Sequence, residues 1–81
     1  MIRFKNENST KNFNSVTIGE VKLYFSYETC IAFEKGDKMI ATQNKWGSTT
    51  GKHLNLISSK EDRISYEDFQ KELNKLQIIA K

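Results

Sequence analysis

Residues Ser65–Lys81 read SYEDFQKELNKLQIIAK, and this stretch predicts an amphipathic α-helix from Tyr66 to Lys81. Ser65 stands at the N-cap position, where its hydroxyl can accept a hydrogen bond from the backbone N–H of Asp68. The apolar residues recur at helical spacing and form one stripe: Phe69, Leu73, Leu76 and Ala80. Such a stripe needs a second layer to cover it, so we expect the helix to pack on a sheet.

The chain before this helix shows the pattern of β-strands. Residues Val21–Tyr27 carry an apolar side chain at every second position, which is typical of a half-buried strand. Gly19 and Gly36 supply the turns of two predicted β-hairpins. The candidate strands are, in order, Ile2–Lys5, Val16–Ile18, Val21–Tyr27, Thr29–Glu34, Lys38–Thr42 and His53–Ile57. Asn6–Asn14 is predicted to be a polar loop, and Ser58–Arg63 a charged surface loop.

The predicted fold class is α+β: a four- to five-stranded antiparallel β-sheet, arranged as a meander and covered by one C-terminal α-helix. The length of 81 residues fits a single domain. Within it we expect a partly mobile N-terminal segment over 1–15, the β-sheet over 16–57 and the helix over 65–81.

Cysteine content and hydropathy limit the class of protein. The one cysteine, Cys30, excludes an intrachain disulfide and lies in an apolar run, which predicts a buried structural thiol. No stretch is apolar enough to span a membrane, and the N-terminus lacks the basic-then-apolar order of a signal peptide. We therefore expect a cytoplasmic protein without contact with a membrane. Abundant Lys, Asn and Ile with no proline indicate an AT-rich coding source, such as a low-GC bacterium or its phages, and hence a bacterial host.

The net charge of +3 comes from eleven Lys and two Arg set against ten Asp and Glu. Arginine is the usual reader of guanine edges and the usual bidentate partner of phosphate. Its scarcity argues against sequence-specific DNA recognition, and the charge is too small to indicate nucleic-acid binding by itself.

The segment Asn44–His53 holds the residues that best fit a binding role. Trp46 is suited to stacking on a nucleic-acid base, with Lys45 and Lys52 near phosphates and His53 beside them. The alternative is that Trp46 packs against the sheet edge or a helix end, and that the Ser-Thr-Thr tract forms a bulged hairpin turn. The spacing of Gly47 and Gly51 is one residue short of a phosphate-binding loop, so a nucleotide site is not expected.

The sequence contains no pattern that indicates catalysis. The single histidine has no second histidine to form a metal site, and we expect it to be a structural residue or a binding contact. The acidic residues fall on predicted loops and on the wet face of the helix, where solvation explains them. The protein is therefore expected not to be an enzyme, and neither a cofactor nor a metal is predicted.

A second candidate surface is the sheet face opposite the helix. If Val21, Leu23 and Phe25 face the helix, then Lys22 and Tyr24 point outward on the other face. An uncovered face with an exposed tyrosine is a suitable surface for a protein partner. The alternative is an ordinary solvated face.

Several short runs carry a family resemblance: YFSYET at 24–29, Ala32-Phe33, Asn44-Lys45-Trp46 and TTGKHL at 49–54. Together they resemble a largely uncharacterised family of small proteins found in phages and other mobile elements. The resemblance covers Val21 to Leu76. It implies a mobile-element origin and one compact domain, and it assigns no catalytic residue.

Two functions follow as expectations. The first is a non-enzymatic binding protein of phage type that binds a host protein or a protein–nucleic-acid complex, for example as an anti-defence, anti-CRISPR-like inhibitor. The alternative is a nucleic-acid-binding accessory protein that uses the Asn44–His53 segment. The proposed binding residues are Lys22, Tyr24, Lys45, Trp46, Lys52 and His53, and the oligomeric state stays open.

Overall fold

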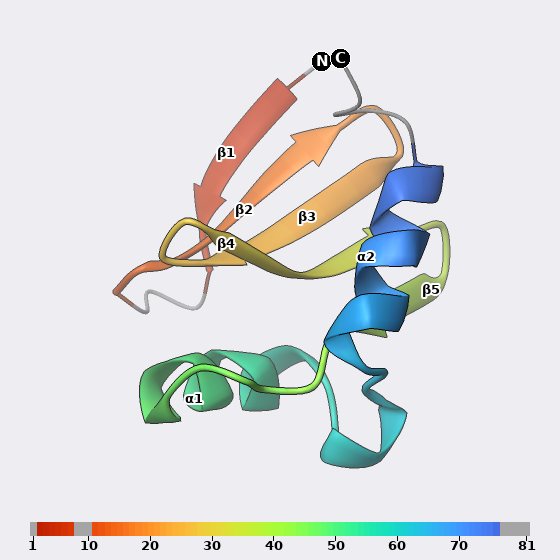
Figure 1. Cartoon of the computed structure of the whole chain (residues 1–81). Helices are drawn as coiled ribbons and strands as arrows, with labels where there is room; N and C mark the ends of the chain where they lie inside the picture. Colours follow the sequence, from red (N-terminus) through yellow and green to blue (C-terminus); the bar gives the residue numbers. More distant parts are fainter. Residues whose placement is uncertain (1, 8–10, 77–81) are drawn as a thin grey trace.

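The computed structural model describes residues 2–7 and 11–76 of the chain. Five strands are followed by two α-helices with a short 3-10 helix between them (Figure 1). The elements are β1 (Ile2–Asn6), β2 (Phe13–Ile18), β3 (Val21–Ser26), β4 (Thr29–Lys35), β5 (Lys38–Ala41), α1 (Ser48–Ile57), η1 (Lys60–Asp62) and α2 (Tyr66–Lys75).

The strands form one antiparallel sheet in the order β1-β2-β3-β4-β5, which confirms the predicted meander. Both predicted glycine turns are present, with positive φ angles of 60° at Gly19 and 62° at Gly36. The extra residue Ile31 bulges β4 opposite the Tyr24–Phe25 step of β3. Because of this bulge, the neighbouring residues Ile31 and Ala32 both join the same hydrophobic cluster.

Helix α2 covers the sheet face that carries Val21, Leu23 and Phe33. Its apolar stripe places Phe69 and Leu73 in this cluster, with Phe69 fully buried. The predicted cap is confirmed, since the backbone N–H of Asp68 donates to Ser65 Oγ at 3.1 Å. The helix begins at Tyr66 as expected, and the last part of the predicted helix, 77–81, lies outside the described residues.

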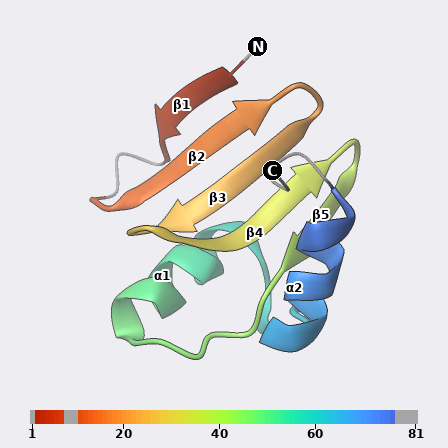
Figure 2. The same ribbon diagram turned by 45° about the horizontal axis from the view of Figure 1, so that its top comes forward.

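The prediction of a single helix is wrong, because the structure contains a second helix, α1, at Ser48–Ile57. Residues His53–Ile57, which were predicted to form a strand, belong to this helix. It packs Leu54 against Phe13, Tyr24 and Ile31 on the other face of the sheet. Figure 2 shows α1 at the end of the sheet where β2 begins and β3 ends, and α2 next to β5. The alternation of Leu54 and Leu56 was misleading because Leu56 is 50% exposed.

The buried stripe of α1 consists of Thr50, His53 and Leu54, with Ile57 partly buried. Its helical spacing was hidden in the sequence because two of its members are polar. The helix also replaces the predicted bulged turn: residues 43–47 form a loop, and Ser48–Lys52 are helical.

Three predicted boundaries also change. The sheet ends at Ala41 rather than at residue 57. Of the predicted polar loop Asn6–Asn14, Asn6 ends β1 and Phe13–Asn14 begin β2, while residues 8–10 lie outside the described part. The predicted surface loop Ser58–Arg63 contains η1 and ends in Arg63, which is buried.

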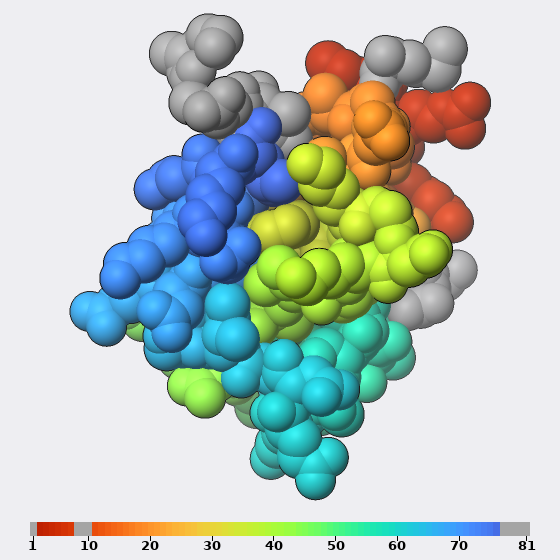
Figure 3. Space-filling model, turned by 90° about the vertical axis from the view of Figure 1, so that its right-hand side faces the viewer, coloured from red at the N-terminus to blue at the C-terminus, as the bar shows by residue number. Residues whose placement is uncertain are grey.

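The sheet edge at β5 faces the solvent beside α2 (Figure 3). A hollow of about 220 Å³ lies here, lined by Phe33, Lys35, Lys38, Ile40, Glu72, Lys75 and Leu76. At its rim Lys75 already pairs with Glu72 at 3.1 Å, so this hollow offers less free charge than the pocket described next. Within the described residues, neither helix has the length and apolar character needed to cross a membrane.

Candidate functional site

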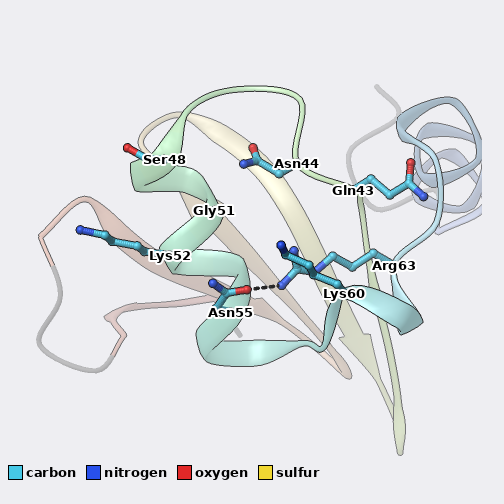
Figure 4. A pocket seen from close by; sticks show the side chains of 8 residues that line it. All are labelled: Gln43, Asn44, Ser48, Gly51, Lys52, Asn55, Lys60 and Arg63. Carbon is cyan, nitrogen blue, oxygen red and sulfur yellow. Dashed lines mark hydrogen bonds between the residues drawn. The ribbon is translucent and has the colours of Figure 1, made fainter.

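A polar pocket of about 520 Å³ lies between α1, the loop that precedes it and the segment around η1 (Figure 4). Its lining residues are Gln43, Asn44, Ser48, Gly51, Lys52, Asn55, Lys60 and Arg63. Three of these residues are cationic, and no lining residue among those described is acidic. We call this site the basic pocket.

The backbone places Arg63 beside the loop that follows β5. The Gln43 N–H donates to Ile64 O at 2.7 Å, and the Ile64 N–H donates to Ala41 O at 3.0 Å. These bonds form an isolated parallel bridge between Thr42 and Ile64. The basic pocket therefore depends on two segments that are about twenty residues apart in the chain.

The Arg63 side chain joins this bridge to the C-terminal end of α1. Its Nη2 donates to Asn55 Oδ1 at 2.8 Å (Figure 4). The same nitrogen donates to Ser58 O at 2.9 Å. A cation near the C-terminal carbonyls of a helix is also favourable for the helix dipole.

The charge of Arg63 lacks a compensating carboxylate among the described residues. The residue is only 8% exposed, and its Nε has no hydrogen-bond partner there. Burial of a guanidinium without an anion is unfavourable, because the charge loses water and gains no counter-charge. An anion bound in the pocket would supply the missing charge.

Lys60 and Lys52 add two exposed ammonium groups to the pocket. Figure 4 shows Lys60 next to Arg63, whereas the Lys52 side chain points away from Arg63 at the outer rim. A lysine stem has several rotatable bonds, so the Lys52 ammonium can turn toward a bound anion. The pocket thus combines one fixed cation with two adjustable ones.

Asn44 fixes the loop that forms the other wall. Its Oδ1 accepts from the Trp46 N–H at 3.0 Å, and its Nδ2 donates to Gly47 O at 3.1 Å. Gly51 makes room for this side chain, since a Cβ at Gly51 would lie 2.9 Å from Asn44 Nδ2. The loop before α1 is therefore held in one shape by a single amide.

Lys45 and Trp46 follow Asn44 in this loop and pack on α2. The Lys45 Nζ lies 4.4 Å from the centre of the Tyr66 ring, and the Trp46 ring meets Tyr66 edge-on at 5.5 Å. The predicted packing of Trp46 against a helix end is confirmed, yet the side chain remains 39% exposed. Packing and an accessible aromatic surface are thus both present in Trp46.

His53 does not belong to the exposed site. It is 1% exposed, stacks on Phe13 at 4.9 Å, and its Nδ1 lies 2.7 Å from Ser26 Oγ. Burial lowers its pKa from the ordinary value of 6.5, against an opposing hydrogen bond to the Lys11 backbone. A neutral imidazole in this place is a structural link between α1 and the sheet, so the prediction of His53 as a binding contact is wrong.

Tyr24 and Lys22 also differ from the prediction of an open sheet face. Tyr24 is 5% exposed, because α1 covers this part of the sheet. Lys22 forms an ion pair of 3.3 Å with Glu7 and lies 4.9 Å from the centre of the Tyr24 ring. These two residues are part of the fold rather than of an open binding surface.

The Cys30 thiol and the possible metal ligands do not form a reactive site among the described residues. Burial raises the pKa of the Cys30 thiol to about 11, against an opposing interaction with the Ala32 backbone. The neutral thiol donates a weak hydrogen bond of 3.5 Å to Ala32 O. The thiol is half-buried rather than fully buried. In the part of the chain that the structure describes, no three His, Cys, Asp or Glu side chains come together as a possible metal site.

Comparison with known protein families gives a match over most of the chain. Residues 1–72 match a family described as "Family of unknown function (DUF8033)". The chain belongs to this family. Comparisons of the DUF8033 chain with curated proteins and with solved structures found no match.

Of the binding residues predicted from the sequence of this DUF8033 chain, Lys52 lines the basic pocket, whereas Lys45 and Trp46 pack on Tyr66 outside it. Arg63, Lys60 and Asn55 were not predicted. One available signal was that Arg63 is one of only two arginines in a lysine-rich chain. Its burial depends on the bridge between Thr42 and Ile64, which has no local sequence pattern. The DUF8033 match covers Arg63, Lys60 and the rest of the pocket.

Proposed function

We propose that this protein is a non-enzymatic binding protein that contacts the phosphate backbone of nucleic acid, free or within a protein–nucleic-acid complex, through the basic pocket. The observation that carries the proposal is the buried guanidinium of Arg63, which has no carboxylate partner among the described residues. A phosphate oxygen supplies the counter-charge that this guanidinium lacks.

The other lining residues suit the same ligand. Lys52 and Lys60 add positive charge, and the amides of Gln43, Asn44 and Asn55 can bond to phosphate or sugar oxygens. The hollow at β5 is less suitable, because one of its lysines already has an acidic partner. The described part of the chain therefore favours the Arg63 side of the molecule for an anionic polymer.

The structure supports a partner that consists of protein alone less well than the sequence did. That expectation relied on an open face around Tyr24 and Lys22, and α1 covers Tyr24. The mobile-element origin and the anti-CRISPR-like role stay predictions that derive from the resemblance. Both are compatible with contact to the nucleic acid of a defence complex.

Binding of a labelled single-stranded oligonucleotide, followed by fluorescence anisotropy at several salt concentrations, tests the proposal. The test variant is Lys52→Gln with Lys60→Gln, and the matched control is Lys38→Gln with Lys71→Gln. Each pair removes two positive charges from a chain of net charge +3, but the control lysines are exposed and line no part of the basic pocket.

The pocket variant is expected to bind about tenfold more weakly and to show a salt slope smaller by about 1.4, because about two phosphate contacts to a single strand are lost. The control pair should change the affinity much less. Equal losses in both pairs would mean that only net charge matters, and the absence of binding by the native protein at low salt would refute the proposal.

A further inference from the structure

A second hollow of about 430 Å³ lies on the other side of the first turn of α1. It is lined by Ser26, Tyr27, Thr29, Trp46, Gly47, Ser48, Thr49 and Thr50. Ser48 lines both this hollow and the basic pocket, so the two sites adjoin. We call the second site the aromatic hollow.

Two exposed aromatic side chains line the aromatic hollow. Tyr27, at the β3–β4 turn, is 53% exposed, and Trp46, in the loop before α1, is 39% exposed. They come from segments far apart in the chain and converge on one space. Large aromatic side chains that remain accessible in a small protein are typical of binding surfaces.

Tyr27 occupies a position that a different residue would fill more easily. Its φ of 58° lies in the left-handed region, which glycine and asparagine tolerate better than an aromatic residue. The turn itself needs only the backbone there, since the Tyr27 N–H donates to Asn12 O at 2.8 Å. The Tyr27 ring makes a tilted contact with the buried His53 ring, with 6.3 Å between the ring centres, and the rest of it adds accessible aromatic surface that the backbone of the turn does not require.

We infer that the ligand is single-stranded, and that one unpaired base enters the aromatic hollow against Tyr27 and Trp46 while a neighbouring phosphate occupies the basic pocket. This inference rests on the proposed function. The first turn of α1 separates the two sites, so a strand that crosses this turn reaches both. Bases in a duplex stay stacked on their neighbours and cannot enter such a hollow without being unpaired.

The polar groups of the hollow fit a base without selecting one. The exposed hydroxyls of Ser48 and Thr49 can donate or accept hydrogen bonds, while the Ser26 hydroxyl is already used by Thr50 and His53. Stacking on an aromatic ring tolerates every base, because each base has a π-face. We therefore expect weak sequence preference and a clear preference for single strands.

The experiment uses Trp46, which is the only tryptophan of the chain and so gives a fluorescence signal from the hollow itself. The full-length protein is titrated with three ligands of equal phosphate count: a single-stranded thymidine homopolymer, its abasic counterpart and a duplex. Quenching of Trp46 and the anisotropy of labelled ligands are measured together.

The thymidine strand should quench Trp46 and bind at least about fivefold more tightly than the abasic strand, because base stacking is lost without bases. Tyr27→Phe should keep this preference. Tyr27→Asn should reduce it to near one while the protein stays folded, because asparagine tolerates the positive φ, although the ring contact with His53 is lost.

The two proposals fail in different ways. If the abasic strand binds as tightly as the thymidine strand, or if Tyr27→Asn keeps the preference, the base site is wrong and the phosphate site stands. If the duplex binds as tightly as the single strand, the inferred ligand class is also wrong. If no strand binds at low salt, the proposed function fails and the inference fails with it.

Discussion

Arg63 Nη2 donates a 2.8 Å hydrogen bond to Asn55 Oδ1, which ties the residue after η1 to the last turn of α1. The same nitrogen donates to Ser58 O at 2.9 Å. Arg63 thus holds the end of the helix and also leaves an uncompensated charge in the basic pocket. The hydrogen bonds to α1 and Ser58 fix the position of the Arg63 side chain. Its positive charge is the basis of the proposed ligand binding.

Inorganic phosphate should stabilise the native protein through Arg63. At a phosphate concentration about ten times Kd, the Tm should rise by about 8 °C over chloride of the same ionic strength, because only the folded state has the pocket. Differential scanning fluorimetry measures this increment. Arg63→Gln should lose the increment whatever its own starting Tm, and an equal rise in the variant would point to a general salt effect.

The buried His53 should make the protein less stable in mild acid. Its pKa is lowered in the folded state, so below the unfolded value of 6.5 the unfolded chain binds more protons than the folded one. Its contribution to the unfolding free energy is therefore fully present above pH 6.5 and declines as the pH falls toward the folded pKa. Urea denaturation across this range measures the decline.

His53→Gln should flatten that pH dependence, because glutamine does not titrate. Glu7 does not interfere in this window. Burial opposes its ionisation, but hydrogen bonds from Ser15 and Lys22 lower its pKa below the ordinary value of 4.5, so its contribution declines only at lower pH. An unchanged slope between neutral pH and pH 5 in the variant would contradict the assignment.

The packing of α2 on the sheet can be tested with two leucines. Leu73 is 5% exposed in the cluster around Phe33 and Phe69, so Leu73→Ala should cost about 2–4 kcal/mol of unfolding free energy by leaving a cavity. Leu56 is 50% exposed on α1, and Leu56→Ala should cost much less. Chemical denaturation compares the two, and a loss below about half a kcal/mol for Leu73→Ala would refute its place in the core.

Local sequence patterns were sufficient for the hairpins and for the start of α2. Positive φ angles at Gly19 and Gly36, alternation along β3 and the Ser65 cap all act within a few residues. Helix α1 was not predictable in this way. Its buried face includes Thr50 and His53, and hydrogen bonds to both from Ser26, on a distant strand, help to satisfy these polar residues inside the protein.

In the candidate site, too, residues with a local sequence pattern were predictable and residues placed by distant contacts were not. Lys52 and Trp46, which line the basic pocket and the aromatic hollow, were found because cationic and aromatic residues lie close together in the sequence, whereas Lys45 lines neither site. Arg63 was missed because its burial results from the bridge between Thr42 and Ile64, and Tyr27 was assigned to a strand rather than to an exposed turn. Contacts between remote segments decide both positions, and sequence periodicity does not report them.

The central claim is that nucleic-acid phosphate binds at Arg63, and NMR can test it residue by residue. An amide correlation spectrum recorded during titration with a single-stranded oligonucleotide also contains the side-chain Nε–H signal of Arg63. We predict that this signal and the backbone amides of Ser48, Gly51 and Lys52 show the largest shifts. Largest shifts along β1, or a spectrum that does not change at low salt, would contradict the account.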